Sequence, residues 1–301
     1  MRIQLGQPYS FTQTGRRSNQ EDARFPDVDK PSPSPAYYIV CDGVGGEEAG
    51  EIASRTVCDA FGAYMDKHYN ATSFTTEDFS DALDYAYNAL YRKGRNTSGD
   101  MATTLTFVCF HENGVLAAHI GDSRIYQIRP DAGIMYRSDD HSLVNAMVHS
   151  GNMTPEEAIN NPQSNIITRC MECVAHKEDR AMATVMEITD VEAGDYFLLC
   201  TDGVLESVTD EEIVRLFDEA DDEKKIKMLA KKAKGNSDNN TAYLIPVKNV
   251  VNTDNMFFSE DEPACTAQDT IIIGGVKKEA TDVVAKNVPS IFDRIISLFK
   301  R

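Results

Sequence analysis

Short apolar runs that end beside a single aspartate constrain the fold of this 301-residue chain more than any other feature. Residues 37–41 read YYIVC and are followed by Asp42, and residues 196–200 are followed after one threonine by Asp202. Apolar runs of this length, rich in β-branched and aromatic residues, predict buried strands. We therefore expect a sheet whose strands deliver carboxylates to one edge.

Five acidic residues stand singly, each in a motif of its own: Asp22, Asp42, Asp122, Asp202 and Asp238. Isolated carboxylates at strand ends are ill suited to packing, but they suit hard divalent cations, which prefer oxygen ligands. Taken one at a time, an Asp-Gly or Asp-Asn pair is usually a turn, and Asp122 could be a local cap. Together the five acids predict a metal-dependent hydrolase.

Length and composition limit the classes of protein that fit. With 42% hydrophobic residues, the chain can build one large core plus an appendage, or two smaller domains, and the apolar periodicity favours the first. The net charge of −18 argues against a nucleic-acid surface, which requires a basic footprint. A protein with this negative charge also repels phosphorylated substrates, unless bound cations make the electrostatic potential at the site positive.

The seven cysteines are odd in number and scattered, which does not indicate a disulfide framework. Cys170 and Cys173 have redox spacing, but no second pair or nearby histidine completes a zinc site, and we expect two ordinary half-buried thiols. Residues 1–14 contain no apolar signal core, and no stretch approaches the ~20 apolar residues of a membrane span. We therefore expect a cytoplasmic protein without a transmembrane segment.

Strands and long helices alternate over residues 1–247, which favours a mixed sheet-and-helix domain. The Asn-Gly pair at Asn113 predicts a hairpin between strands at 103–110 and 115–120, and further strands are expected at 125–128 and 241–247. Two helical stripes are expected to face the core rather than a cofactor: Ala49, Ile52, Ala53, Val57, Ala60, Phe61, Tyr64 and Met65, and then Phe79, Leu83, Ala86, Tyr87 and Leu90.

An insert at residues 145–169 contains Thr154-Pro155-Glu156-Glu157, which combines an N-cap, a proline at the first helical position and a capping-box acid. This insert is expected to be either a flap over a site or an ordinary surface loop. Residues 248–286 are polar and predict a disordered linker. Residues 287–301 predict an amphipathic helix that docks on the domain, in a partner groove or on a membrane surface.

Seven motifs then occur in an order that resembles the metal-dependent, type 2C (PPM) serine/threonine protein phosphatases, in their bacterial style. The resemblance covers about residues 9–247. The motifs are Arg17-Ser18-Asn19-Gln20-Glu21-Asp22, Asp42-Gly43-Val44-Gly45-Gly46, Ala102-Thr103-Thr104, Gly121-Asp122-Ser123-Arg124, Asp140-His141-Ser142-Leu143-Val144, Cys200-Thr201-Asp202-Gly203 and Asp238-Asn239. Each is weak alone, but their shared order is specific.

The resemblance implies an α+β fold: a four-layer α-β-β-α sandwich of two antiparallel sheets flanked by helix pairs. It also implies two Mg²⁺ or Mn²⁺ ions at one edge and a weaker third ion. By position, Asp42 bridges the two main ions, the Gly43 carbonyl oxygen completes one sphere, and Asp202 and Asp238 bind the first ion.

By the same resemblance, Glu21 and Asp22 serve the second ion directly or through water, and Asp122 helps to hold the third. Arg17 is expected to hold the substrate phosphate, because a planar guanidinium can grip two phosphate oxygens. Two adjacent dications can activate a shared water as the nucleophile, so Asp42 acts in catalysis through the metals and no protein nucleophile is required.

The function expected from this resemblance is hydrolysis of phosphoserine and phosphothreonine on phosphoproteins, opposing a cognate serine/threonine kinase. Two alternatives stay open: a non-catalytic phosphopeptide-binding regulatory module on the same fold, and a hydrolase of small phosphate esters. Departures from the family pattern include Val44, where eukaryotic relatives carry a histidine, and Ala102, where a glycine is usual. The general acid is therefore unassigned, and His141 is expected to be a structural hydrogen-bonding residue.

Overall fold

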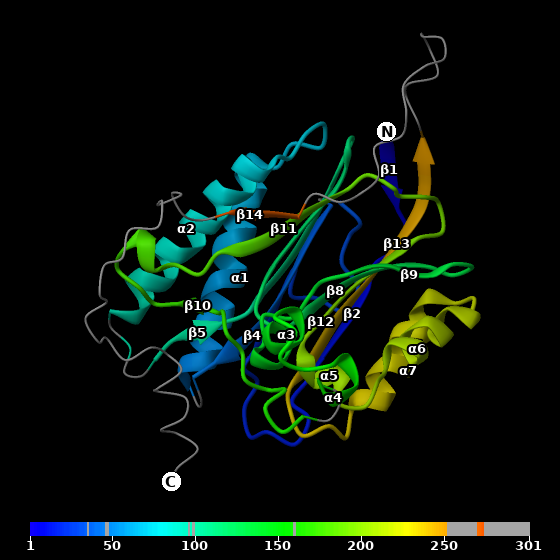
Figure 1. The fold of residues 1–301 in the computed structure, drawn as a ribbon. Helices are drawn as coiled ribbons and strands as arrows, with labels where there is room; N and C mark the ends of the chain where they lie inside the picture. The colour runs from blue at the N-terminus through cyan, green and yellow to red at the C-terminus, as the bar shows by residue number, and fades with distance from the viewer. Residues whose placement is uncertain are drawn as a thin grey trace.

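The computed structural model describes residues 1–34, 36–45, 48–95, 97, 100–158, 161–251 and the backbone of 270–273. Two antiparallel sheets lie at its centre (Figure 1). The six-stranded sheet contains β1 (Arg2–Leu5), β2 (Tyr9–Gln13), β8 (Arg124–Arg129), β9 (Gly133–Arg137), β12 (Tyr196–Cys200) and β13 (Asn240–Val251). The eight-stranded sheet contains β3 (Asp22–Phe25), β4 (Tyr37–Val44), β5 (Ala102–Thr103), β6 (Leu105–His111), β7 (Gly114–Ile120), β10 (Met171–Glu172), β11 (Ala183–Ile188) and β14 (Thr270–Ile273).

Helices cover the outer faces of both sheets (Figure 1). The long helices α1 (Glu48–His68) and α2 (Thr76–Gly94) lie on the eight-stranded sheet. On the other side, α5 (Asp202–Leu205), α6 (Asp210–Arg215) and α7 (Asp222–Ala233) pack on the six-stranded sheet. The remaining helical segments are α3 (Leu143–His149), α4 (Pro155–Ala158) and the 3₁₀ turns at Lys177–Asp179 and Leu216–Asp218.

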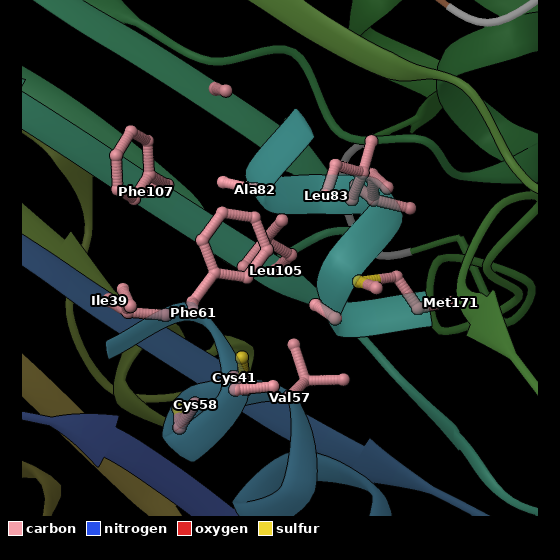
Figure 2. Packing of buried hydrophobic residues seen from close by; sticks show 14 of the residues in the cluster. Ile39, Cys41, Val57, Cys58, Phe61, Ala82, Leu83, Leu105, Phe107 and Met171 are labelled. Atoms are coloured by element: carbon pink, nitrogen blue, oxygen red, sulfur yellow. The ribbon is translucent and has the colours of Figure 1, made fainter. Parts of the chain in front are cut away.

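Alternation along the strands creates the layers. In β4, Tyr37, Ile39 and Cys41 face the helices α1 and α2, whereas Tyr38 and Val40 face the other sheet. The side chains of a strand point to opposite faces in turn, so a run of apolar residues fills two separate cores. Figure 2 shows the helix-facing core, in which Phe61 of α1 packs near Phe107 and Leu105 of β6.

The six-stranded sheet repeats this arrangement. Phe197 and Leu199 of β12 face the inter-sheet core, and Leu198 and Cys200 face α5 to α7. Three cores separated by two sheets give four layers, as predicted. The predicted hairpin is also confirmed, because β6 and β7 pair from Leu105↔Ile120 to His111↔Gly114.

Both predicted helical stripes face the core. Phe79, Leu83, Ala86, Tyr87 and Leu90 are all buried in α2, and α2 begins at a capping box formed by Thr75 and Asp78. Helices α6 and α7 were not predicted one by one. The α7 segment is dominated by lysine and acidic residues, so few apolar positions mark it as a core-facing helix, although their spacing is helical.

The predicted domain boundary at Val247 differs from the structure. Strand β13 continues to Val251, and residues 249–251 pair with β1. Residues 270–273 form β14, which pairs with the edge strand β11. The expected linker over 248–286 is therefore corrected at these two stretches, and the rest of it, with the helix predicted at 287–301, lies outside the described residues.

The insert at 145–169 starts within α3 and contains the predicted cap. The Thr154 backbone N–H donates to Glu157 Oε2 at 2.9 Å, and the Glu157 N–H donates to Thr154 Oγ1 at 3.2 Å. A bridge between Ser142 and Ile167 closes the base of the insert. None of the helices in the described ranges is long and apolar enough to cross a membrane.

Candidate metal centre

Strand pairing places Asp22 directly opposite Asp42. The two residues are register partners in the antiparallel pair β3–β4. Asp42 is fixed from its other side by Thr104, whose Oγ1 accepts the Asp42 N–H at 2.9 Å and whose N–H donates to the Asp42 carbonyl oxygen at 2.8 Å. The apolar run before Asp42 is buried on both faces, so the aspartate is held in a rigid position.

Asp202 reaches the same place from the other sheet. It is the first residue of α5, directly after β12 and Thr201. In addition to burial, the charge of Asp202 acts on the Asp42 carboxyl group and raises its pKa, and Thr201 Oγ1 donates to Asp22 Oδ2 at 3.0 Å. The carboxylates of β3, β4 and α5 therefore meet across the gap between the sheets.

Asn239 joins Glu21 and Asp238 to this group. Its Oδ1 accepts the Glu21 N–H at 2.7 Å, and its Nδ2 donates to the Asn19 carbonyl oxygen at 2.9 Å. The neighbouring Asp238 caps it, because Asp238 Oδ1 accepts the Asn239 N–H at 2.8 Å. One amide side chain thus fixes the start of β3 against the start of β13.

Two glycines allow this close approach. A Cβ atom on Gly203 would lie 1.9 Å from the Asn239 carbonyl oxygen, and a Cβ atom on Gly43 would lie 2.3 Å from the Gly50 carbonyl oxygen. The Gly43 N–H also donates to the Glu21 carbonyl oxygen at 3.0 Å. Only glycine fits either position, which explains the Asp-Gly pairs in the sequence better than a turn does.

Asp122 lies beside the cluster, buried after the end of β7. Burial raises its pKa well above the ordinary value, and the charges of Asp202 and Asp140 raise the pKa further. The neighbouring Asp140 is held by Arg124, which donates to its two carboxylate oxygens at 2.7 Å each.

Arg17 stands at the solvent edge of the cluster. Its Nη2 donates to Asp238 Oδ2 at 2.7 Å, and its side chain is 58% exposed. It is the single cation with a described contact to the six predicted acidic ligands. The Asp238 carboxylate, as the main cause, raises the pKa of Arg17.

Burial and mutual repulsion govern the charge of the acids. Burial raises the pKa of Asp22 to about 8, and the nearby Asp202 and Asp238 charges add to this. Burial also raises the pKa of Asp42 far above its usual range, with further contributions from Asp22, Asp202 and Asp122. The pKa values of Glu21 and Asp202 are raised by burial as well.

The chemistry of these residues fits divalent cations. Asp22 Oδ1 and Asp202 Oδ1 are buried, and neither has a hydrogen-bond partner among the described residues. A buried carboxylate oxygen without a partner is costly, and an oxygen-only donor set is the one that Mg²⁺ and Mn²⁺ prefer. Across the described ranges, no three Asp, Glu, His or Cys side chains are already arranged to hold an ion, and Asp238 is paired with Arg17.

Thr104, Thr201 and Asn239 have no role predicted from the sequence. Each holds a predicted ligand: Thr104 holds Asp42, Thr201 holds Asp22, and Asn239 holds Glu21. All three lie within the quoted motifs, next to or near the aspartates. A small hydroxyl or amide residue repeated in those motifs was the available signal.

His141 is structural, as expected. Its Nδ1 accepts the Gly121 N–H at 3.1 Å, and its Nε2 lies 2.9 Å from Thr184 Oγ1. The ring stacks on His119 with centroids 4.5 Å apart. Burial lowers the pKa of His141 to about 3, so the ring is neutral near pH 7 and anchors the backbone before Asp122.

Comparisons with known proteins agree with this geometry. The family model described as Protein phosphatase 2C matches residues 17–232. Protein phosphatase PhpP of Streptococcus pneumoniae serotype 2 is 36% identical over 179 residues, which cover 58% of this chain and 70% of the relative.

Solved structures show the same fold. The PPM Ser-Thr phosphatase MsPP from Mycobacterium smegmatis, in complex with cacodylate, superposes with a TM-score of 0.68 and 26% identity, covering 82% of this chain and all of that chain. The catalytic domain of the serine threonine protein phosphatase PstP, in complex with 2 manganese ions, gives a TM-score of 0.66 and 28% identity over 81% of this chain and 99% of that chain. The chain therefore belongs to the protein phosphatase 2C family.

Proposed function

We propose that this protein is a metal-dependent phosphatase that hydrolyses phosphoserine and phosphothreonine on proteins. One observation carries the proposal: carboxylates from β3, β4 and the start of α5 meet at one edge, where Asp22 Oδ1 and Asp202 Oδ1 are buried with no hydrogen-bond partner among the described residues. The names and folds of the relatives support it. The intact ligand set argues against a non-catalytic phosphopeptide-binding module.

Mg²⁺ or Mn²⁺ would fit as cofactor. Asp42, the Gly43 carbonyl oxygen, Asp202 and Asp238 would hold the first ion, and Asp42 would also contact the second. Glu21 and Asp22 would serve that second ion, and Asp122 a weaker third. The PstP catalytic domain, solved with 2 manganese ions, supports an assignment of two main ions.

Two bound dications would supply charge neutralisation and a water of lowered pKa as the nucleophile. The chain's own contribution is to place the carboxylates and to bind the phosphate. Arg17 is suited to the second task, since its exposed guanidinium lies at the edge of the cluster and can turn from Asp238 toward a phosphate. Val44 supplies no proton, which leaves the general acid unassigned.

Cysteine nucleophiles do not fit this site. Cys200 is fully buried, and burial raises its pKa to about 12. Burial also raises the pKa of Cys170. A thiol attacks phosphorus only as the thiolate, so both residues are unreactive at neutral pH.

Phosphoproteins are the expected substrates, and a cognate serine/threonine kinase is the expected opposing enzyme, in a cytoplasmic setting. Small phosphate esters are the second candidate, because the cluster edge is open enough for Arg17 to be exposed. Comparing kcat/KM for a phosphothreonine peptide and for a small phosphate metabolite separates the two candidates.

The assignment is tested by phosphopeptide turnover during a Mn²⁺ titration. Asp42→Asn and Asp202→Asn are expected to abolish turnover while the fold, measured by circular dichroism, is kept. Asp131→Asn, in the exposed turn between β8 and β9, is the matched control and should keep full activity. Mn²⁺-dependent turnover by the Asp42→Asn variant would refute the assignment.

A further inference from the structure

Arg169 faces a cavity that the proposed chemistry does not use. The cavity has a volume of about 240 Å³ and is lined by Ile167, Thr168, Arg169, Cys170, Glu172, Asp179, Ala181 and Met182. It lies where the chain leaves the insert and enters β10. The Arg169 side chain is half-buried.

The contact between Arg169 and His141 leaves the guanidinium without an acceptor. The Gly121 N–H donates to His141 Nδ1, so Nδ1 carries a lone pair and the neutral ring bears its proton on Nε2. That proton is directed to Thr184 Oγ1 at 2.9 Å. Arg169 Nη1 lies 3.4 Å from the same Nε2, so two N–H donors face each other at this contact.

Among the described residues, no carboxylate forms an ion pair with Arg169. Glu172 and Asp179 line the same cavity, yet neither forms an ion pair or a hydrogen bond with Arg169 in the described part of the chain. The other half-buried arginine near this cavity, Arg180, is paired with Asp84 at 3.0 Å. In the described part of the chain, no Arg169 nitrogen is among the buried polar atoms that lack a partner, so the guanidinium reaches the solvent of the cavity, where an anionic ligand can bind it.

A few residues of extended peptide are enough to connect the metal centre with the cavity. Gly43 pairs with Thr103, and Thr103 pairs with Met171 in the same row of the sheet. Adjacent strands lie about 4.8 Å apart, so this two-strand step spans roughly 10 Å. An extended peptide advances about 3.3 Å per residue, which places the cavity about three residues from a phosphoresidue at the metals.

We propose that Arg169 and its cavity form a substrate subsite that binds an acidic side chain located about three residues from the phosphoserine or phosphothreonine. This inference rests on the proposed phosphatase function and adds to it a preference for substrates with an acidic flank. The anion can be a carboxylate or a second phosphate, since the guanidinium binds both.

The test is a scan of one phosphothreonine peptide, neutral elsewhere, in which a single Asp is moved from four residues before to four residues after the phosphoresidue. A second series carries phosphoserine in place of the Asp and separates the two anions. With the full-length protein and Mn²⁺, kcat/KM should rise about 10-fold at one position two to four residues away, as expected for one charge-assisted hydrogen bond.

Arg169→Gln should remove that preference, so that the ratio of kcat/KM for the best acidic peptide and the neutral peptide falls about 10-fold. Arg169→Glu should reverse the preference toward a Lys-containing peptide. Arg55→Gln, which removes an exposed arginine paired with Asp27, is the matched control and should keep the wild-type ratio.

Equal kcat/KM for all peptides with the wild-type protein would overturn the subsite. A uniform loss on every peptide in Arg169→Gln would also overturn it, because it would place Arg169 in the support of His141 and Asp122. Failure of the wild-type protein to hydrolyse any peptide or aryl phosphate is a separate result, which would overturn the phosphatase function itself.

Discussion

In addition to burial, the charge of Asp202 raises the pKa of Asp42, although Asp42 lies in β4 of one sheet and Asp202 follows β12 of the other. Burial disfavours the charged form of both carboxyl groups and raises the pKa of each. This arrangement shows that the fold holds acidic groups together against their repulsion. Such an arrangement is stable when cations bind there.

Metal is expected to stabilise the protein. Glu21, Asp22, Asp42, Asp202 and Asp238 would carry five negative charges against four positive charges from two dications. A ligand at 100 times its Kd stabilises by about 2.7 kcal/mol, which corresponds to a rise in Tm of roughly 5–10 °C for a domain of this size. Scanning calorimetry with excess Mn²⁺ or with chelator measures the rise, and an unchanged Tm would count against the metal site.

Stability of the chelated protein should depend on pH in a defined direction. Burial raises the pKa of Asp22 to about 8 from an ordinary 3.8, so folding favours the protonated acid and stability is lost as the pH rises toward 8. His141, with its pKa lowered to about 3, has the opposite effect, but only below its ordinary 6.5. Between pH 6.5 and 8, the change in stability therefore comes from the buried carboxyl groups and not from His141.

Urea unfolding with chelator at pH 6.5 and pH 8 measures this effect. The free energy of unfolding should be lower at pH 8, and Asp22→Asn should reduce the difference. Greater stability at pH 8 would show that Asp22 is already ionised in the folded protein.

Much of the fold and part of the site could be predicted from the sequence. The segments before Asp42 and Asp202 are apolar, so the sequence predicts both the buried strands and the carboxylates that follow them. Strand β3 is short and half polar, and its pairing with β4 is non-local. The contact between Asp22 and Asp42 was therefore expected from the family resemblance and not from the pattern.

The supporting residues could not be predicted because they act through geometry. Thr201 looks like an ordinary residue between a strand and a helix. Its hydroxyl nevertheless donates to Asp22 Oδ2 and accepts the Thr241 N–H at 3.0 Å. Strand β14 was missed for another reason: its apolar run is short, and it lies in a polar segment that suggested a linker.

Replacing Thr201 tests this supporting role. Thr201→Val should lower the free energy of unfolding by about 1–3 kcal/mol, because the Thr241 N–H and an Asp22 oxygen lose their partner in the core. The affinity for Mn²⁺ should fall about 10–100-fold. Thr201→Ser keeps the hydroxyl and should retain most of both quantities, and equal effects of the two substitutions would argue against the hydrogen bond.

Gly203 provides a steric test of the close contact at the site. Gly203→Ala places a Cβ atom 1.9 Å from the Asn239 carbonyl oxygen, so α5 and the start of β13 must separate. We expect a loss of about 1–3 kcal/mol in unfolding free energy and a large loss of phosphatase activity. Gly235→Ala, which meets nothing within 4 Å, is the matched control, and similar results for both variants would refute the steric explanation.

Anomalous diffraction from crystals of the full-length protein soaked in MnCl₂ tests the central claim most directly. The account predicts two strong manganese peaks, one on each side of the Asp42 carboxylate, with Asp202 and Asp238 around the first and Glu21 and Asp22 near the second. A map without peaks among these side chains, at Mn²⁺ concentrations that saturate phosphopeptide turnover, would contradict it.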